Sequence, residues 1–188
     1  MEILLLGDSI RMYYQQKVID LLGGGYHVSA PTENCRFAAY TLNSLRMWLP
    51  SFPKPDVIHW NNGLWDTAVL YQEDGCFTPL PEYIRSLERI LRELQKTGAR
   101  VIFATTTPCD PRKAALTTAM PPCHRNEDIR RYNEAAVELM RRERMEINDL
   151  YAVVNENIPA YVSEDMIHPT EEGKRVLAEA VVRKIREK

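Results

Sequence analysis

The sequence has no apolar run long enough to cross a bilayer, and no block of basic residues that would favour nucleic acid. Its formal net charge is -2, and the clustered Arg141, Arg142 and Arg144 suit the solvated end of a charged helix. The 4 cysteines include no Cys-x-x-Cys pair, and no phosphate-binding Gly-rich loop follows the first apolar run. We therefore expect no nucleic acid or membrane partner, no metal and no cofactor.

A signal-peptide core is also missing, because the apolar run at residues 3–6 is short and no basic segment precedes it. This predicts a cytoplasmic protein, or a secreted one if a leader has been removed. Reduced thiols follow from the first case, whereas a Cys109–Cys123 bridge is the alternative for an exported protein. The length of 188 residues, with 45% hydrophobic and 27% charged residues, predicts a single globular domain over residues 1–188.

Short apolar runs alternate with amphipathic stretches along the whole chain, which is typical of a parallel sheet covered by helices on both faces. Five strands are expected, and they are predicted at residues 3–6, 26–30, 57–60, 101–104 and 145–147. The expected fold class is therefore α/β.

Capping residues indicate where three of the helices begin. Thr78 is a candidate cap with Pro79 at the first helical position, and Gly98 fits the end of the same helix. Asn126 and Thr170 are the candidate caps of two later helices. Residues 108–125 contain four prolines and little periodicity, which predicts a long loop at the edge of the sheet where α/β proteins place their sites.

Ser9 stands between the first predicted strand and a helical pattern, in the sequence Gly7-Asp8-Ser9. A serine at such a turn projects from the carboxyl edge of the sheet, and its backbone N–H at a helix start can hold an anion. The alternative is that Asp8 and Ser9 only cap the helix. The tripeptide alone favours capping over catalysis.

A second motif, Asp165-Met166-Ile167-His168-Pro169, precedes the last predicted helix. A spacing of three residues lets the Asp165 carboxylate bind one imidazole nitrogen of His168 and leave the other free to take a proton. The alternative is a surface histidine beside an ordinary loop aspartate. Because both motifs are expected at the edge of one sheet, their coincidence favours a catalytic serine.

These two motifs resemble the first and last sequence blocks of the SGNH hydrolases, also called GDSL esterases, and the resemblance in strand order covers nearly the whole chain. It implies a flavodoxin-like three-layer α/β/α sandwich with a central, mainly parallel five-stranded sheet. It also implies ester hydrolysis, with Ser9 as the nucleophile, His168 as the base and Asp165 as the residue that orients the base.

The middle blocks depart from the family pattern. Arg36 stands where the family's second block has a glycine whose N–H enters the oxyanion hole, and the alternative is that Arg36 faces solvent or pairs with Glu33. The third block matches at Gly63 and Asp66, but Trp65 replaces the oxyanion asparagine.

The expected oxyanion donors are therefore the N–H groups of Ser9 and Arg36, with a side chain from Asn61, Asn62 or Trp65. Strand alternation slightly favours Asn61 over Asn62.

The expected substrate is a small-molecule or carbohydrate ester with a short acyl chain, such as an acetylated sugar, because the family includes many sugar deacetylases. Asp8, Trp65 and Thr107 are candidates to contact this substrate. Two alternatives stay open, an inactive SGNH-like protein that binds a glycan or another small ligand, and a flavodoxin-like binding module in which Ser9 is only a cap.

Overall fold

A computed structural model describes residues 1–71, 75–113 and 124–187 of the chain. Its strands are β1 (Glu2–Leu6), β2 (His27–Ser29), β3 (Val57–Trp60), β4 (Arg100–Ala104) and β5 (Glu146–Asn148). Its helices are α1 (Ser9–Leu22), α2 (Ala38–Ser51), α3 (Leu80–Gln95), α4 (Asn126–Arg142), α5 (Leu150–Asn155), α6 (Ile158–Tyr161) and α7 (Glu171–Arg186). All five predicted strands are present, each within one or two residues of its expected bounds.

The strands form one sheet in the order β2-β1-β3-β4-β5, and every neighbouring pair is parallel. The order is that of flavodoxin-like folds, in which the chain reverses its direction of winding between β1 and β3. Ligands of such sheets bind outside the carboxyl ends of the strands at this reversal. The predicted fold class is confirmed.

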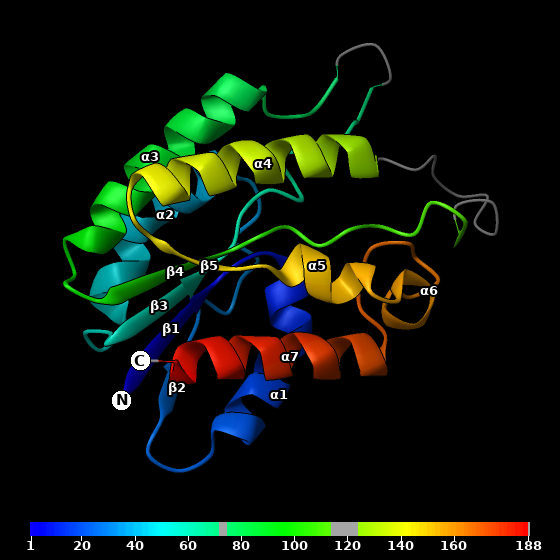
Figure 1. The fold of residues 1–188 in the computed structure, drawn as a ribbon. Helices are drawn as coiled ribbons and strands as arrows, with labels where there is room; N and C mark the ends of the chain where they lie inside the picture. Colours follow the sequence, from blue (N-terminus) through cyan, green and yellow to red (C-terminus); the bar gives the residue numbers. More distant parts are fainter. Residues whose placement is uncertain (72–74, 114–123, 188) are drawn as a thin grey trace.

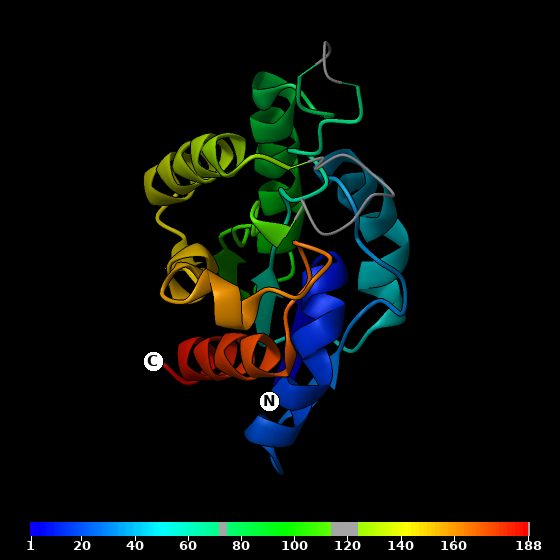
Figure 2. The same cartoon turned by 90° about the vertical axis from the view of Figure 1, so that its right-hand side faces the viewer.

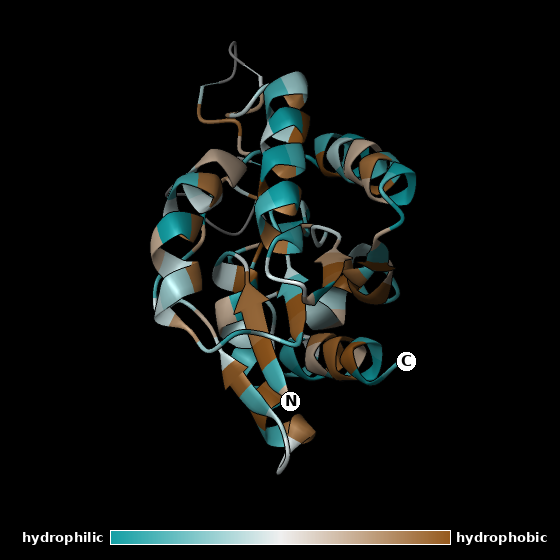
Figure 3. Ribbon diagram, turned by 90° about the vertical axis from the view of Figure 1, so that its left-hand side faces the viewer, coloured by the Kyte–Doolittle hydropathy of each residue, from teal (hydrophilic) through white to brown (hydrophobic). Residues whose placement is uncertain are grey.

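Helices cover both faces of this sheet, with α1 and α7 on one side and α2, α3 and α4 on the other (Figures 1 and 2). Successive residues of β1 point to opposite faces, so Ile3 and Leu5 join the core under α1 and α7, while Leu4 and Leu6 join the other core. Both faces are apolar because both are buried, and the brown stripes of the helices in Figure 3 lie toward the sheet.

Two of the three predicted caps are wrong. The N-cap of α3 is Pro79, without a side-chain bond, and the Thr78 N–H donates to the Asp66 carbonyl instead. Asn126 is the first residue of α4, and its amide exchanges hydrogen bonds with the backbone of Cys109. Thr170 caps α7 as predicted, since its hydroxyl accepts from the N–H of Gly173 at 3.0 Å.

Three helices, α2, α5 and α6, have no counterpart among the predictions. Helix α2 carries polar residues between its buried positions and Pro50 in its last turn, which weakens its helical signal. The predicted long loop and the Cys109–Cys123 alternative fall partly outside the described residues. None of the helices within the described ranges is long and apolar enough to cross a membrane.

Candidate active site

Ser9 is the first residue of α1 and follows β1 after only Gly7 and Asp8. The turn is tight, since a Cβ on Gly7 would lie 2.8 Å from the Cβ of Arg11. Asp8 caps the helix by accepting the N–H of Ile10 at 2.9 Å. The capping alternative thus holds for Asp8, and it leaves the Ser9 hydroxyl available for other contacts.

The Ser9 hydroxyl contacts His168, the histidine predicted from the sequence as its partner. Ser9 Oγ lies 2.8 Å from Nε2 of His168, and Nδ1 of the same ring lies 2.6 Å from Oδ2 of Asp165. The three side chains therefore form a continuous hydrogen-bonded chain from hydroxyl through imidazole to carboxylate. In this arrangement the carboxylate fixes the imidazole tautomer and leaves Nε2 able to accept the serine proton.

The Asp165 carboxylate is held in place by four donors, one of which is Nδ1 of His168 at Oδ2. Its Oδ1 accepts from the Ser163 hydroxyl at 2.8 Å and from the backbone N–H groups of Ile167 at 3.0 Å and His168 at 2.9 Å. Partial burial opposes ionisation of this group, but the hydrogen bonds outweigh it and hold the pKa of Asp165 below its usual range. The carboxylate is therefore ionised at neutral pH.

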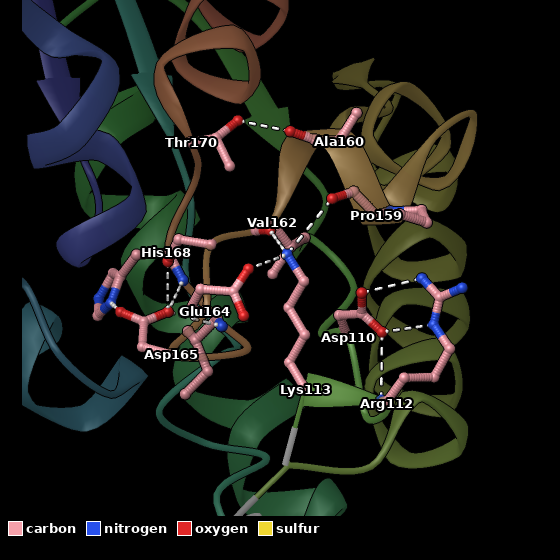
Figure 4. Close-up of polar contacts among 12 residues, drawn as sticks. Asp110, Arg112, Lys113, Pro159, Ala160, Val162, Glu164, Asp165, His168 and Thr170 are labelled. Atoms are coloured by element: carbon pink, nitrogen blue, oxygen red, sulfur yellow. Dashed lines mark hydrogen bonds and ion pairs between the residues drawn. The ribbon is translucent and has the colours of Figure 1, made fainter. Parts of the chain in front are cut away.

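The turn that carries Asp165 and His168 is closed on itself and anchored from outside. The Ser163 N–H donates to the carbonyl of His168 at 2.7 Å, and Met166 takes a left-handed backbone with a φ of 74°. Lys113, whose side chain is only 15% exposed, donates to the carbonyl of Val162 at 2.6 Å and pairs with Glu164 at 3.1 Å (Figure 4). The start of the loop after β4 thus braces the turn.

Asp8 and Thr107 are both buried, with 0% and 5% of their surface exposed. They line a cavity of about 10 Å³, together with Tyr14 and Asn61. Burial raises the pKa of Asp8 to about 6, against the lowering effects of the Ile10 N–H and of the Arg11 and His168 charges. Asp8 therefore adds a titratable negative charge close to His168.

Comparison with known proteins places the chain in a family. A sequence model of the GDSL-like lipase/acylhydrolase family matches residues 5–176. The chain belongs to this family. A search of curated protein sequences gave no match.

Several solved structures share the fold of the chain. An acetyl xylan esterase superposes with a TM-score of 0.78 and 17% identity over 98% of this chain and 100% of its own. A lipase/acylhydrolase from Enterococcus faecalis superposes with a TM-score of 0.79 and 18% identity, over 98% of this chain and 94% of its own. An acetylxylan esterase from Geobacillus stearothermophilus superposes with a TM-score of 0.75 and 18% identity, over 100% of this chain and 94% of its own.

In the second block of this GDSL-like chain, Arg36 adopts a backbone conformation that is typical of glycine. Arg36 has a φ of 51°, in the left-handed region that favours glycine. Its N–H donates to Oδ1 of Asn34 at 2.7 Å, and its guanidinium lies 4.7 Å from the centre of the Tyr40 ring. Glu33, the other expected partner, accepts hydrogen bonds from Tyr40 and Trp48.

In the third block, the hydrogen bonds of Asn61 and Asn62 differ, and this difference distinguishes the two alternative oxyanion donors. Asn62 is fully buried, and its amide hydrogens are used by the Arg36 carbonyl at 3.0 Å and the Thr41 hydroxyl at 2.9 Å. Asn61 donates to the carbonyl of Ala104 at 3.1 Å, which leaves one of its two amide hydrogens. Trp65 is 40% exposed. Asn61 is therefore the better placed of the two asparagines to donate to a ligand.

Arg11 and Lys113 position the site but were missed at the level of sequence. Arg11 lies on the buried face of α1 with Tyr14, Val18 and Leu22. Its helical spacing from these apolar residues is the feature of the sequence that could have indicated its burial. Lys113 lies in a proline-rich segment without periodicity, so nothing local indicated its contacts.

The remaining histidines do not join the triad. His59 is buried in β3, and burial lowers its pKa to about 3. His27 pairs with Glu2 at 2.6 Å. Within residues 1–71, 75–113 and 124–187, no group of three His, Cys, Asp or Glu side chains could hold a metal ion.

Proposed function

We propose that the protein is a serine esterase that cleaves short-chain carboxylic esters, with Ser9 as nucleophile, His168 as general base and Asp165 as its orienting partner. The observation that carries the proposal is the unbroken contact chain, 2.8 Å from Ser9 Oγ to His168 Nε2 and 2.6 Å from His168 Nδ1 to Asp165 Oδ2. Membership of the GDSL-like lipase/acylhydrolase family supports the same chemistry.

In this mechanism Ser9 Oγ attacks the ester carbonyl while its proton passes to Nε2 of His168. Asp165 stabilises the imidazolium that forms. The same proton then moves to the departing alcohol, which leaves an acyl group on Ser9. Water attacks the acyl-enzyme with His168 again as the base, and the acid is released.

The negative charge on the tetrahedral intermediate needs donors at the edge of the sheet. The Ser9 N–H at the start of α1 and the second amide hydrogen of Asn61 are the proposed donors. Arg36 offers a further backbone N–H at the position of the family's glycine. It now donates to Asn34, so it contributes when the oxyanion replaces the Asn34 side chain as its acceptor.

The proposed substrate is a small-molecule or carbohydrate ester with a short acyl group, such as an O-acetyl sugar. Two of the structural neighbours are described as acetyl xylan esterases, which supports this substrate class. The exposed ring of Trp65 stands after β3 at the same edge as Ser9, where it can pack against a sugar ring.

The proposal is tested by the release of p-nitrophenol from p-nitrophenyl acetate by the wild type, Ser9→Ala and His168→Ala. Both variants should lose about 10⁴-fold or more in kcat while keeping a native circular dichroism spectrum. Ser86→Ala on α3 and His27→Ala on β2 are the matched controls and should retain full activity.

Two outcomes would contradict the proposal. Unchanged hydrolysis in Ser9→Ala and His168→Ala would make both residues structural. A wild type that is inactive on acetyl and longer acyl esters would favour the alternative of a GDSL-like protein that binds a glycan or another small ligand without cleaving it.

A further inference from the structure

The ring of Tyr13 stacks on the imidazole of His168. The two ring centres lie 4.7 Å apart and the ring planes differ by 21°. Tyr13 reaches this place because it follows Ser9 by four residues on α1, which puts both side chains on one face of the helix, one turn apart. The same helix therefore supplies the nucleophile and an aromatic neighbour of the base.

The contacts of His168 are divided between its edge and its face. In the plane of the ring, Nδ1 meets Asp165 and Nε2 meets Ser9. Those contacts set the direction of the nitrogens but still allow the ring to tilt about the line between them. A stacked aromatic ring opposes that tilt, because it supports the imidazole from its face.

The stacking also bears on the charge of His168. The face of a phenol ring is the negative end of its quadrupole, so it attracts a cation more strongly than a neutral ring. When the proton of Ser9 moves to Nε2 as the bond to the ester carbon forms, the stacked imidazole becomes such a cation.

We propose that Tyr13 is a positioning residue that keeps His168 in line with Ser9 and stabilises its protonated form during ester cleavage. This inference rests on the proposed function for its kinetic consequences. The stabilisation itself is a property of the ring pair and is present without substrate.

Other charges around the pair limit the size of the effect. Asp165 at Nδ1 and the buried Asp8 place carboxyl groups beside the imidazole, while the charge of His168 acts against protonation of His124. Nζ of Lys174 lies 5.1 Å from the centre of the Tyr13 ring, so this ring already interacts with one cation. Lys174 is partly neutralised by Glu171, which also pairs with Lys17.

The first test compares the pH profiles of kcat/KM for the wild type, Tyr13→Phe and Tyr13→Leu. Leucine keeps an apolar side chain but removes the aromatic face, so kcat should fall about two- to fivefold with KM little changed. The acidic limb should move to lower pH, because loss of the aromatic face destabilises protonated His168. Phenylalanine keeps the ring and should match the wild type. Tyr26→Leu, which removes an aromatic ring beside Arg186 and not beside His168, is the control.

The second test follows the His168 imidazole by NMR through a pH titration of the free protein. The titration midpoint of Tyr13→Leu should be a few tenths of a pH unit below those of the wild type and Tyr13→Phe. This readout needs no turnover, so it separates the failure of this inference from a failure of the esterase proposal. A midpoint and a kcat in Tyr13→Leu equal to the wild type would overturn the inference, as would a loss in Tyr13→Phe as large as that in Tyr13→Leu.

Discussion

The guanidinium of Arg11 binds the carbonyl oxygen of Gly7, the residue that follows β1 and precedes Asp8 and Ser9. Its Nε and Nη2 lie 3.4 Å and 3.3 Å from this oxygen, and the side chain is 2% exposed. The same guanidinium donates to the carbonyls of Pro31 at 3.0 Å and Glu33 at 2.8 Å. Arg11 therefore ties the turn before Ser9 to the loop that carries Arg36.

Replacing Arg11 tests this connection. A lysine has one nitrogen and cannot reach all three carbonyls, so Arg11→Lys should lower the free energy of unfolding by about 2–4 kcal/mol, because buried acceptors lose their donors. Ester hydrolysis should also decrease, since the loop of the second block is released. Urea denaturation and kcat measure the two effects. The exposed Arg46 on α2 provides the control, and an Arg11→Lys protein as stable as Arg46→Lys would contradict the expected role.

Asn61 and Asn62 should respond differently to alanine. Asn61→Ala removes a proposed oxyanion donor and should reduce kcat by about 10²- to 10³-fold with a small change in Tm. Asn62→Ala leaves the Arg36 carbonyl, the Thr41 hydroxyl and the indole N–H of Trp60 without their partner, so it should lower Tm markedly. Kinetics and thermal unfolding of both variants decide between them. The reverse pattern would assign the oxyanion role to Asn62.

Gly63 should tolerate no side chain. Its φ is 147°, and a Cβ there would overlap the hydroxyl of Thr106 and lie 3.1 Å from the hydroxyl of Tyr83. Gly63→Ala is expected to cost about 3 kcal/mol of stability. Gly24→Ala, where a Cβ meets no atom within 4 Å, should change stability by no more than about 0.5 kcal/mol. Chemical denaturation of the two variants measures the difference, and equal costs would refute the steric argument.

Asp66 should make stability depend on pH. Burial raises its pKa from 3.8 to about 7, against the lowering effects of the Thr78 side chain and the Ala38 N–H. The folded protein thus binds the Asp66 proton more tightly than the unfolded chain. Stability contributed by this proton is lost as the pH rises from about 4 to about 7, and the loss is complete above that range.

The Asp66→Asn variant isolates this effect. Asparagine stays neutral, so the free energy of unfolding of the variant relative to the wild type should rise between pH 5 and pH 8, by about 3 kcal/mol at most. A lost acceptor for the Ala38 N–H would add a constant offset but no slope. Urea denaturation at several pH values measures the difference, and a difference that does not change with pH would contradict the expected titration.

The strands β1, β3 and β4 could be predicted because each is a short apolar run, buried on both faces and bounded by polar turns. The edge strands β2 and β5 are shorter and only partly buried, so their signal in the sequence is weaker. Burial of the β1 side chains needs no knowledge of which helix covers them. The pairing of Asp165 with His168 could be predicted for a similar reason, since their spacing of three residues brings them together within one turn. The Thr78 and Asn126 caps failed because each residue has a tertiary partner, Asp66 and Cys109 respectively, that competes with the local role.

The sequence by itself determined the parallel sheet, the strand-to-helix turn at Ser9 and the local pair of Asp165 and His168, because burial patterns and short spacings act within a few residues. Tertiary structure alone decided which asparagine keeps a free amide hydrogen, that the Arg36 N–H faces Asn34, and that Lys113 braces the turn that carries Asp165 and His168. It also brought Tyr13 onto the face of His168, 155 residues further along the chain. Such contacts depend on how α1, α7 and the loops pack around the edge of the sheet, and no local pattern of residues specifies that packing.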